Sequence, residues 1–301
     1  MASLKAIRRR IASVKGTQKI TRAMKMVAGA RLARAQSRIL ALRPYAVRTG
    51  ALLADVTQAL AESETAPTEH PLLSRREEKR ALIVVVTSDR GQCGAFNTNI
   101  ARAAERLWRE KQAAGVDVQI ATIGRKGKDY FQRRKAPVFH AFAGVWEKLD
   151  FEQARNIART ILRPFVAQEI DSIYLVYNEF KSAMSQKVTA DALLPLAAAP
   201  AHAEGDSTTA DWERHNEFLF EPDQAALLER LVPMYVEVTL LRALLESMAS
   251  ELGARMTAMD SATKNASEMI SKLTLIYNRA RQAAITTELM EIIGGAEALR
   301  E

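Results

Sequence analysis

The chain has 301 residues, of which 48% are hydrophobic and 26% are charged, an ordinary composition for one large or two modest folded domains. No stretch approaches the roughly 18 apolar residues that a membrane-spanning helix needs. The single cysteine, Cys93, excludes internal disulfides, and the four histidines are scattered along the chain. The sequence therefore predicts neither a metal site nor a bound cofactor.

Positive charge is concentrated at the start of the chain. The formal net charge is +8, yet residues 1–60 contain 13 Lys and Arg and one acid, Asp55, which gives +12 there and −4 for the rest. A basic segment of this kind fits nucleic acid, an anionic membrane surface, a transit peptide or an acidic protein partner. Composition alone does not choose among these four.

Residues 1–60 carry the apolar pattern of a coiled-coil helix, in which apolar or small residues alternate in steps of four and three. The predicted seam consists of Ala28, Leu32, Ala35, Ile39, Leu42, Ala46, Thr49, Leu53, Val56 and Leu60. Toward the N-terminus the same register continues through Leu4, Ile7, Ile11 and Val14, but Gln18, Thr21 and Lys25 interrupt it. Packing alone does not require this polar interruption.

Residues 81–196 predict an α/β domain between two linkers, 61–80 and 197–221. Buried strands are expected at 81–87, 118–124 and 171–178, a last strand in "SQKVTADALLPL", and helices near 97–113, 125–134 and 152–168. Strands that alternate with helices indicate a mostly parallel, Rossmann-like sheet. The linkers contain proline, glycine or polar clusters that are typical of connecting segments.

Residues 222–301 predict a second and longer helix that Gly294 and Gly295 terminate. Its seam consists of Leu227, Leu231, Met234, Val238, Leu241, Leu245, Met248, Leu252, Arg255, Met259, Ala262, Ala266, Met269, Leu273, Ile276, Ala280, Ala283, Thr287 and Met290. Because the two long helices flank one compact insertion, they can meet only as an antiparallel pair. The predicted fold is a mixed α and α/β protein: a long antiparallel coiled coil of the terminal helices with an inserted Rossmann-like domain. The unmatched part of the longer helix needs a partner that encloses it.

The segment "TSDRGQCGAFN", which follows the first predicted strand, lies where nucleotide-binding proteins hold a phosphate. It lacks both the lysine of a phosphate loop and the third glycine of a dinucleotide loop. We therefore interpret it as a tight turn in which Gly91 and Gly94 allow close backbone approach and Asn97 or Thr98 caps the next helix.

Three segments resemble one family: "IASVKGTQKITRAMKMVAGARL" (11–32), "SDRGQCGAFN" (88–97) and "LIYNRARQAAITTELMEIIGGAEAL" (275–299) are similar to the gamma subunit of the rotary F-type ATP synthase. The last segment carries the family signature in Ile285, Thr286, Glu288, Glu291, Gly295 and Ala296. The resemblance implies a non-catalytic central rotor shaft that couples ion-driven rotation to ATP synthesis on the beta subunits. It also implies three alpha and three beta subunits, an epsilon subunit and the membrane c-ring as partners, and a peripheral location on the cytoplasmic side of the inner (plasma) membrane, without insertion into the membrane.

The resemblance also implies subunit contacts. Arg281 and Gln282 match the family's Arg-Gln pair, which hydrogen-bonds to an acidic loop of one beta subunit, and an arginine fork suits carboxylates. Met24 and Lys25 match a stretch that faces the moving lobe of a beta subunit, although many family members have an acid or a glutamine in place of Lys25. Arg255 is either a snorkelling side chain or a polar rotor contact. Thr286, Glu288 and Glu291 are further candidates, and interhelical pairing is an alternative for the two acids.

Two other function classes compete with the rotor shaft. The basic N-terminal segment supports a coiled-coil protein that binds nucleic acid or a membrane surface, but the segment contains only one aromatic residue, Tyr45, for base stacking. The loop at 88–97 supports a nucleotide-binding enzyme, but the required lysine and glycine are missing. On the resemblance, we expect no nucleic-acid partner and no catalytic residue.

Overall fold

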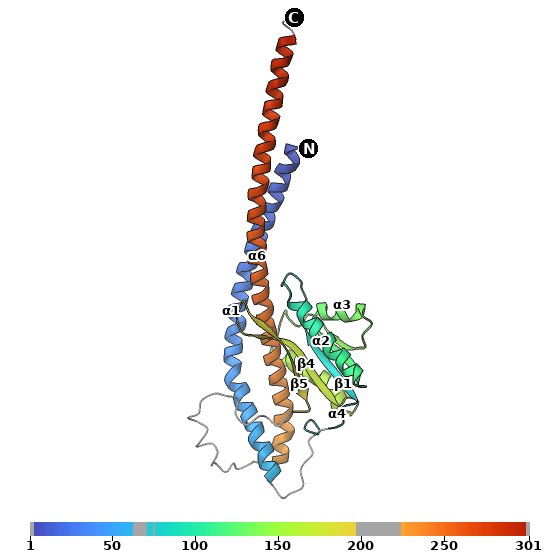
Figure 1. The fold of residues 1–301 in the computed structure, drawn as a ribbon. Helices are drawn as coiled ribbons and strands as arrows, with labels where there is room; N and C mark the ends of the chain where they lie inside the picture. The colour runs from blue at the N-terminus through green and yellow to red at the C-terminus, as the bar shows by residue number, and fades with distance from the viewer. Residues whose placement is uncertain (1–2, 63–70, 75, 197–223, 299–301) are drawn as a thin grey trace. The chain divides into compact units, whose positions relative to one another are not determined.

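The computed structural model describes residues 3–62, 71–74, 76–196 and 224–298 (Figure 1). The chain divides into two compact units, unit 1 with Met1–Ala30 and Arg255–Glu301, and unit 2 with Arg31–Ala254. Two long helices, α1 (Leu4–Glu62) and α6 (Gln224–Ala298), contribute to both units. No helix in the described ranges combines the length and apolarity needed to cross a membrane. Most of the two predicted linkers, at 63–70, 75 and 197–221, lies outside these ranges.

Unit 2 contains a five-stranded sheet in the order β3-β2-β1-β4-β5. The strands are β1 (Arg80–Val86), β2 (Asp117–Ile123), β3 (Val138–Phe142), β4 (Ser172–Phe180) and β5 (Gln186–Leu194). All neighbours pair in parallel except β4 and β5, which are antiparallel. The predicted Rossmann-like, mostly parallel sheet is confirmed. Strand β3 was not predicted. It is a short edge strand with no fully buried residue, so its sequence lacks the apolar run that indicates a buried strand.

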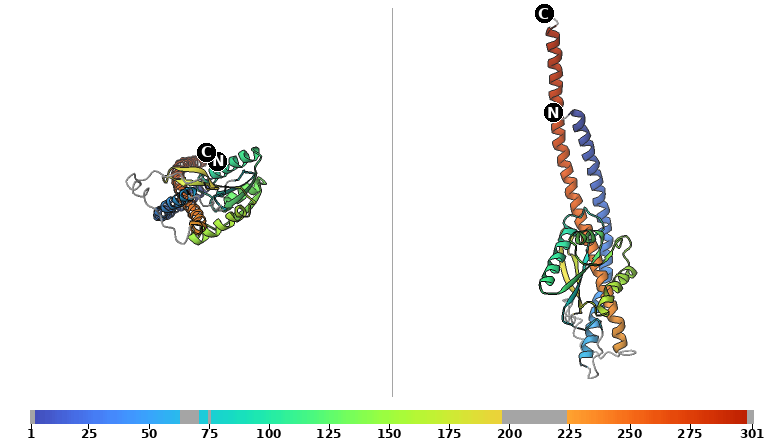
Figure 2. Two further views of the ribbon diagram at one scale, coloured as in Figure 1. Left: turned by 90° about the horizontal axis from the view of Figure 1, so that it is seen from below. Right: turned by 90° about the vertical axis from the view of Figure 1, so that its right-hand side faces the viewer.

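Helices cover both faces of this sheet (Figures 1 and 2). Helices α2 (Phe96–Ala113) and α3 (Arg125–Arg133) pack on one face, where Ala81, Ile83 and Val85 of β1 contribute to the core. Helix α4 (Phe151–Val166) and the unit 2 parts of α1 and α6 pack on the other face, against Leu82, Val84 and Val86. Because successive side chains of a strand point to opposite faces, a central strand covered on both faces is apolar throughout, as "ALIVVV" is.

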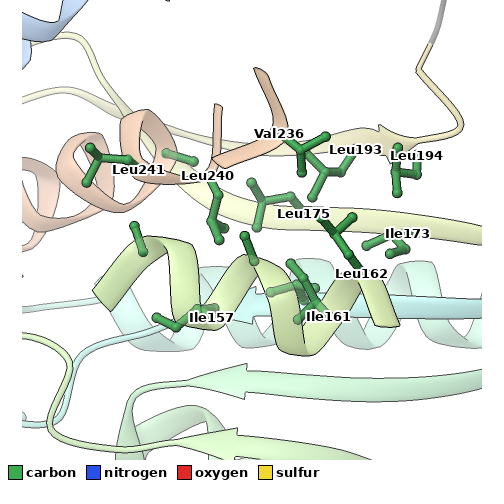
Figure 3. Packing of buried hydrophobic residues seen from close by; sticks show 14 of the residues in the cluster. Ile157, Ile161, Leu162, Ile173, Leu175, Leu193, Leu194, Val236, Leu240 and Leu241 are labelled. Atoms are coloured by element: carbon green, nitrogen blue, oxygen red, sulfur yellow. The ribbon is translucent and has the colours of Figure 1, made fainter. Parts of the chain in front are cut away.

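The larger core of unit 2 joins α4, β4 and α6 (Figure 3). Ile161 of α4, Leu175 of β4 and Leu240 of α6 are 0–2% exposed and belong to one cluster. Complete burial of a side chain of this size stabilises the fold by about 1.5–3 kcal/mol. The inserted domain is therefore attached to α6 by a continuous apolar interface within unit 2.

The predicted seams of the two long helices are largely confirmed. In unit 2, Leu32 and Ala35 of α1 and Ala249 and Leu252 of α6 form one buried cluster. Among the other predicted α1 seam positions, those with described side chains are buried or partly buried: Leu4, Ile7, Ile11, Val14, Gln18, Thr21, Lys25, Ala28, Ile39, Leu42, Ala46, Thr49, Leu53 and Val56. The side chain of Leu60 lies outside the described part of the chain.

Two expectations for α6 are wrong. The helix continues through Gly294 and Gly295 to Ala298, because a glycine lowers helix stability by about 1 kcal/mol relative to alanine without blocking the helical conformation. In unit 1 the predicted seam residues Leu273 and Ala280 are partly buried as expected, but the positions that alternate with them are occupied by Ile270, Tyr277 and Ala284, one residue later than predicted. The expected seam residues there and beyond are exposed: Met269, Ile276, Ala283, Thr287 and Met290. An α-helix has 3.6 rather than 3.5 residues per turn, so a strict heptad pattern drifts toward later residues.

Candidate functional site

The loop between β1 and α2 is held by the side-chain amide of Asn97. Its Oδ1 accepts hydrogen bonds from the backbone N–H of Ser88 at 2.9 Å and from the Ser88 hydroxyl at 3.1 Å, and its Nδ2 contacts Cys93 Sγ at 3.1 Å. Gly94 has a φ of +57°, which glycine adopts without steric cost. Neither Asn97 nor Thr98 is the helix cap that we expected, because Ala95 is the N-cap and no side chain caps α2.

The first N–H groups of α3, which also lie beside this loop, are engaged by the chain itself. The backbone N–H of Arg125 donates to Asp89 Oδ1 at 2.9 Å, and that of Gly127 donates to Thr87 Oγ1 at 2.8 Å. Asp89 Oδ2 also accepts from the N–H of Gly144 at 3.2 Å. A carboxylate therefore holds the place that a phosphate takes at a helix N-terminus. The first donors of α3 are therefore not available to a phosphate.

In unit 1 the polar interruption of the α1 seam contacts polar residues of α6. Lys25 Nζ is 2.5 Å from Asp260 Oδ1, and the hydroxyls of Thr21 and Thr263 are 2.8 Å apart. Met24, which precedes Lys25, is partly buried. The sequence indicated the polar positions on α1 but not their partners, because periodicity does not show which residues of two distant helices are opposite one another.

The same pairs show where the partner of α6 ends. Since Lys25 is opposite Asp260 and Thr21 is opposite Thr263, antiparallel pairing brings the start of α1, Leu4, near Arg281. Within unit 1, α6 continues past this start (Figure 2). Beyond it, exposed apolar side chains recur on α6: Ile285 44%, Leu289 53%, Met290 65%, Ile292 68% and Ile293 59%. A helix surface this apolar is typical of a protein interface.

The predicted contact residues near the end of α6 are exposed. Arg281, Gln282, Thr286, Glu288 and Glu291 are exposed, and the Thr286 hydroxyl donates to the backbone carbonyl of Gln282 at 3.0 Å. Because residues four apart lie on one side of a helix, Gln282 and Thr286 share a face with Leu289 and Ile293.

Arg255 is partly exposed. The structure thus groups the residues from Arg281 to Glu291 at the end of α6, and it places Met24, Lys25 and Arg255 elsewhere on the two helices.

The whole chain is similar to known proteins. A family model described as ATP synthase matches residues 3–299. The chain is 58% identical to the ATP synthase gamma chain of Sorangium cellulosum and 49% identical to that of Geobacter metallireducens, each over all of both chains.

Solved structures agree in fold. The central stalk and c-ring structure of the Tetrahymena thermophila mitochondrial ATP synthase contains a chain that is 26% identical, with a TM-score of 0.60 over 81% of this chain and 99% of that one. A chain of the Euglena gracilis mitochondrial ATP synthase is 21% identical, with a TM-score of 0.66 over 98% and 94%.

Proposed function

Because this chain belongs to the ATP synthase gamma-chain family, and is thus part of the complex that makes ATP, we propose that its paired long helices form the central shaft of the rotary motor. In this proposal the segments 1–60 and 222–301 turn inside a ring of three alpha and three beta subunits. The inserted domain, 81–196, rests on the membrane c-ring and binds the epsilon subunit. The alternative of a nucleic-acid or membrane-surface binder finds no support among these relatives.

The observation that carries this proposal is the apolar end of α6. From Ile285 to Ile293, α6 exposes large apolar side chains beyond the residue opposite the start of α1. One helix with this surface would lose stability in water, whereas a surrounding collar of protein covers it from several sides. A ring of subunits supplies such a collar.

Rotation changes the nucleotide affinities of the beta subunits if the shaft presents different surfaces to them. A ligand or partner shifts a conformational equilibrium only by interacting differently with the two states. Ile285, Leu289 and Ile293 follow one another at four-residue spacing on one side of α6, whereas Glu288 and Glu291 lie on a different side, so α6 is not uniform around its axis. We propose that Arg281 and Gln282 contact an acidic loop of one beta subunit, with Thr286, Glu288 and Glu291 nearby.

The chain itself has no catalytic role in this proposal, and ATP is made on the beta subunits. The loop at 88–97 supports this assignment, because it lacks the lysine and the third glycine that a nucleotide-binding loop needs. The complex would lie peripherally on the cytoplasmic side of the inner membrane.

Affinity purification of the tagged chain from its own host tests the proposal. Membranes are washed at low ionic strength, and the recovered subunits are counted and assayed for ATP hydrolysis, with an untagged strain as control. We expect one tagged chain for every three alpha and three beta subunits, with ATPase activity. Recovery of the chain alone, or with nucleic acid, would refute the shaft assignment.

A further inference from the structure

The strongest unexplained feature of unit 1 is a polar layer inside an otherwise apolar helix pair. On α1, Gln18, Thr21 and Lys25 occupy seam positions where apolar side chains would pack better. Thr21 is only 8% exposed, so its hydroxyl is placed inside the interface and not on its rim. Coiled coils accept such polar positions at a cost in stability when the layer specifies how the helices pair.

Two members of this layer, Thr21 and Lys25, meet polar partners on α6. The hydroxyls of Thr21 and Thr263 are 2.8 Å apart, and each also lies within hydrogen-bonding distance of a backbone carbonyl of its own helix. One turn along, Lys25 Nζ donates to Asp260 Oδ1 at 2.5 Å. The other oxygen of Asp260 is 3.2 Å from Lys264 Nζ, which lies on α6 itself.

The charges of this layer are distributed unevenly. The side chains of Lys25 and Asp260 are 43% and 35% exposed, whereas that of Lys264 is 74% exposed. Hydrogen bonds from Lys25 and then Lys264 hold the pKa of the Asp260 carboxyl below its usual value, so the carboxylate is charged near neutral pH. The ammonium groups of Lys25 and Lys264 share the one carboxylate of Asp260, which leaves a net positive charge. Lys264 is the more exposed of the two lysines.

We propose that Lys25 and Asp260 are positioning residues of the shaft, an internal clamp that holds the N-terminal segment of α1 against α6 where the apolar seam is interrupted. Lys25 then acts through Asp260 and not through a carboxylate of a beta subunit. This role revises the subunit contact expected for Lys25, and it rests on the proposed function only for its effect on coupling.

A charge swap separates the two roles. Lys25→Glu and Asp260→Lys each place like charges opposite one another, and the double variant restores an attractive pair with its polarity reversed. Lys264→Gln is the matched control, because it removes only the partner within α6. All variants carry Thr21→Cys, Thr263→Cys and Cys93→Ser, so that the rate of disulfide formation between positions 21 and 263 reports helix pairing in the full chain and in the assembled complex.

Each single charge reversal should slow disulfide formation about two- to fivefold, the range expected for a solvent-exposed ion pair. The double variant should recover at least half of the lost rate. Lys264→Gln should form the disulfide as fast as the protein that carries only the two cysteines and Cys93→Ser. In membrane vesicles, the number of coupling ions pumped per ATP hydrolysed should fall in the single variants and recover in the double variant. Lys25→Gln, which adds no repulsion, should slow disulfide formation about twofold and serves if a reversal prevents assembly.

Two results would overturn the clamp. Unchanged disulfide formation in Lys25→Glu and in Asp260→Lys would show that the pair does not hold the helices. A pumping defect that the double variant shares with Lys25→Glu would assign Lys25 to a contact on another subunit. If the chain does not assemble with alpha and beta subunits at all, the proposed shaft function fails, while disulfide formation in the full chain still tests the clamp.

Discussion

Replacement of Asp171 by asparagine should destabilise the inserted domain by about 2 kcal/mol. Asp171 joins the starts of two neighbouring strands, because its Oδ2 accepts the backbone N–H groups of Lys79 at 3.1 Å and Arg80 at 2.9 Å. Its Oδ1 is 3.3 Å from a guanidinium nitrogen of Arg80, and its side chain is 7% exposed. Asparagine keeps the size but offers one oxygen, and its amino group would face a donor.

The magnitude follows from the kind of hydrogen bond that is lost. A hydrogen bond to a charged group contributes about 1.5–3 kcal/mol, and a buried donor left without a partner costs a similar amount. Asparagine keeps part of this interaction, which reduces the expected loss to about 2 kcal/mol. For a domain of this size, such a loss lowers the melting temperature by roughly 8 °C.

Tryptophan fluorescence during thermal unfolding of the full chain measures this loss. Trp108 and Trp146 lie in the inserted domain, and Trp212→Phe removes the third tryptophan, which lies outside the described residues. Glu169→Gln is the control, because Glu169 is exposed and two residues from Asp171. A melting temperature of Asp171→Asn within a degree or two of the control would refute the reasoning.

The stability lost in Asp171→Asn should also depend on pH. Burial raises the pKa of Asp171, but the hydrogen bonds from Arg80 and Lys79 outweigh burial and hold it below its usual value. A folded-state pKa below the unfolded value means that the carboxylate stabilises the fold at pH values above the unfolded pKa, about 4, and that this contribution is lost as the pH falls through the folded pKa. The stability difference between the wild type and Asp171→Asn should therefore be constant near neutral pH and shrink below about pH 4. A difference that persists in acid would contradict this linkage.

Three further substitutions test other parts of the structure. Gly124→Ala should destabilise the inserted domain by at least about 3 kcal/mol, because Gly124 has a φ of +99° and a Cβ there would lie 2.1 Å from the Thr87 carbonyl oxygen; a wild-type melting temperature would contradict this. Gly253→Val should cost about 1–3 kcal/mol, since a Cβ would lie 3.1 Å from the Ala183 backbone, and increased stability would show that helix propensity outweighs this contact. Gln282→Ala should lower coupled ATP synthesis in vesicles about fivefold with assembly intact, whereas the exposed control Lys272→Ala should not; unchanged synthesis would refute the beta-subunit contact.

Much of the fold was predictable because it depends on local patterns. The four-three spacing of apolar residues from Ala28 to Val56 predicts which side of α1 is buried, since a helix repeats its orientation within a few residues. The continuous apolar run of β1 likewise indicates a strand covered on both faces. The second predicted helix is longer than the first, so part of its apolar face has no partner on the first helix. The exposed side chains from Ile285 to Ile293 lie in that unmatched part.

Other features depend on which distant residues meet, and the sequence carries no local signal for them. Asp171 and Arg80 are 91 residues apart, and Lys25 and Asp260 are 235 apart. Their pairing is decided by strand order and by the register of the two helices, which the packing of the whole core determines. A heptad pattern is compatible with several registers, because a slip of seven residues keeps apolar side chains opposite one another.

The sequence by itself therefore determined the elements of this protein, its fold class, its family resemblance and the polar interruption of the first helix. Only the tertiary structure decided that Asp89 engages the start of α3, that Asn97 braces the turn without capping α2, and that Asp260 binds Lys25. Local periodicity follows from backbone geometry over a few residues, whereas a hydrogen bond or ion pair needs two groups from different parts of the chain to be brought within about 3 Å by the fold.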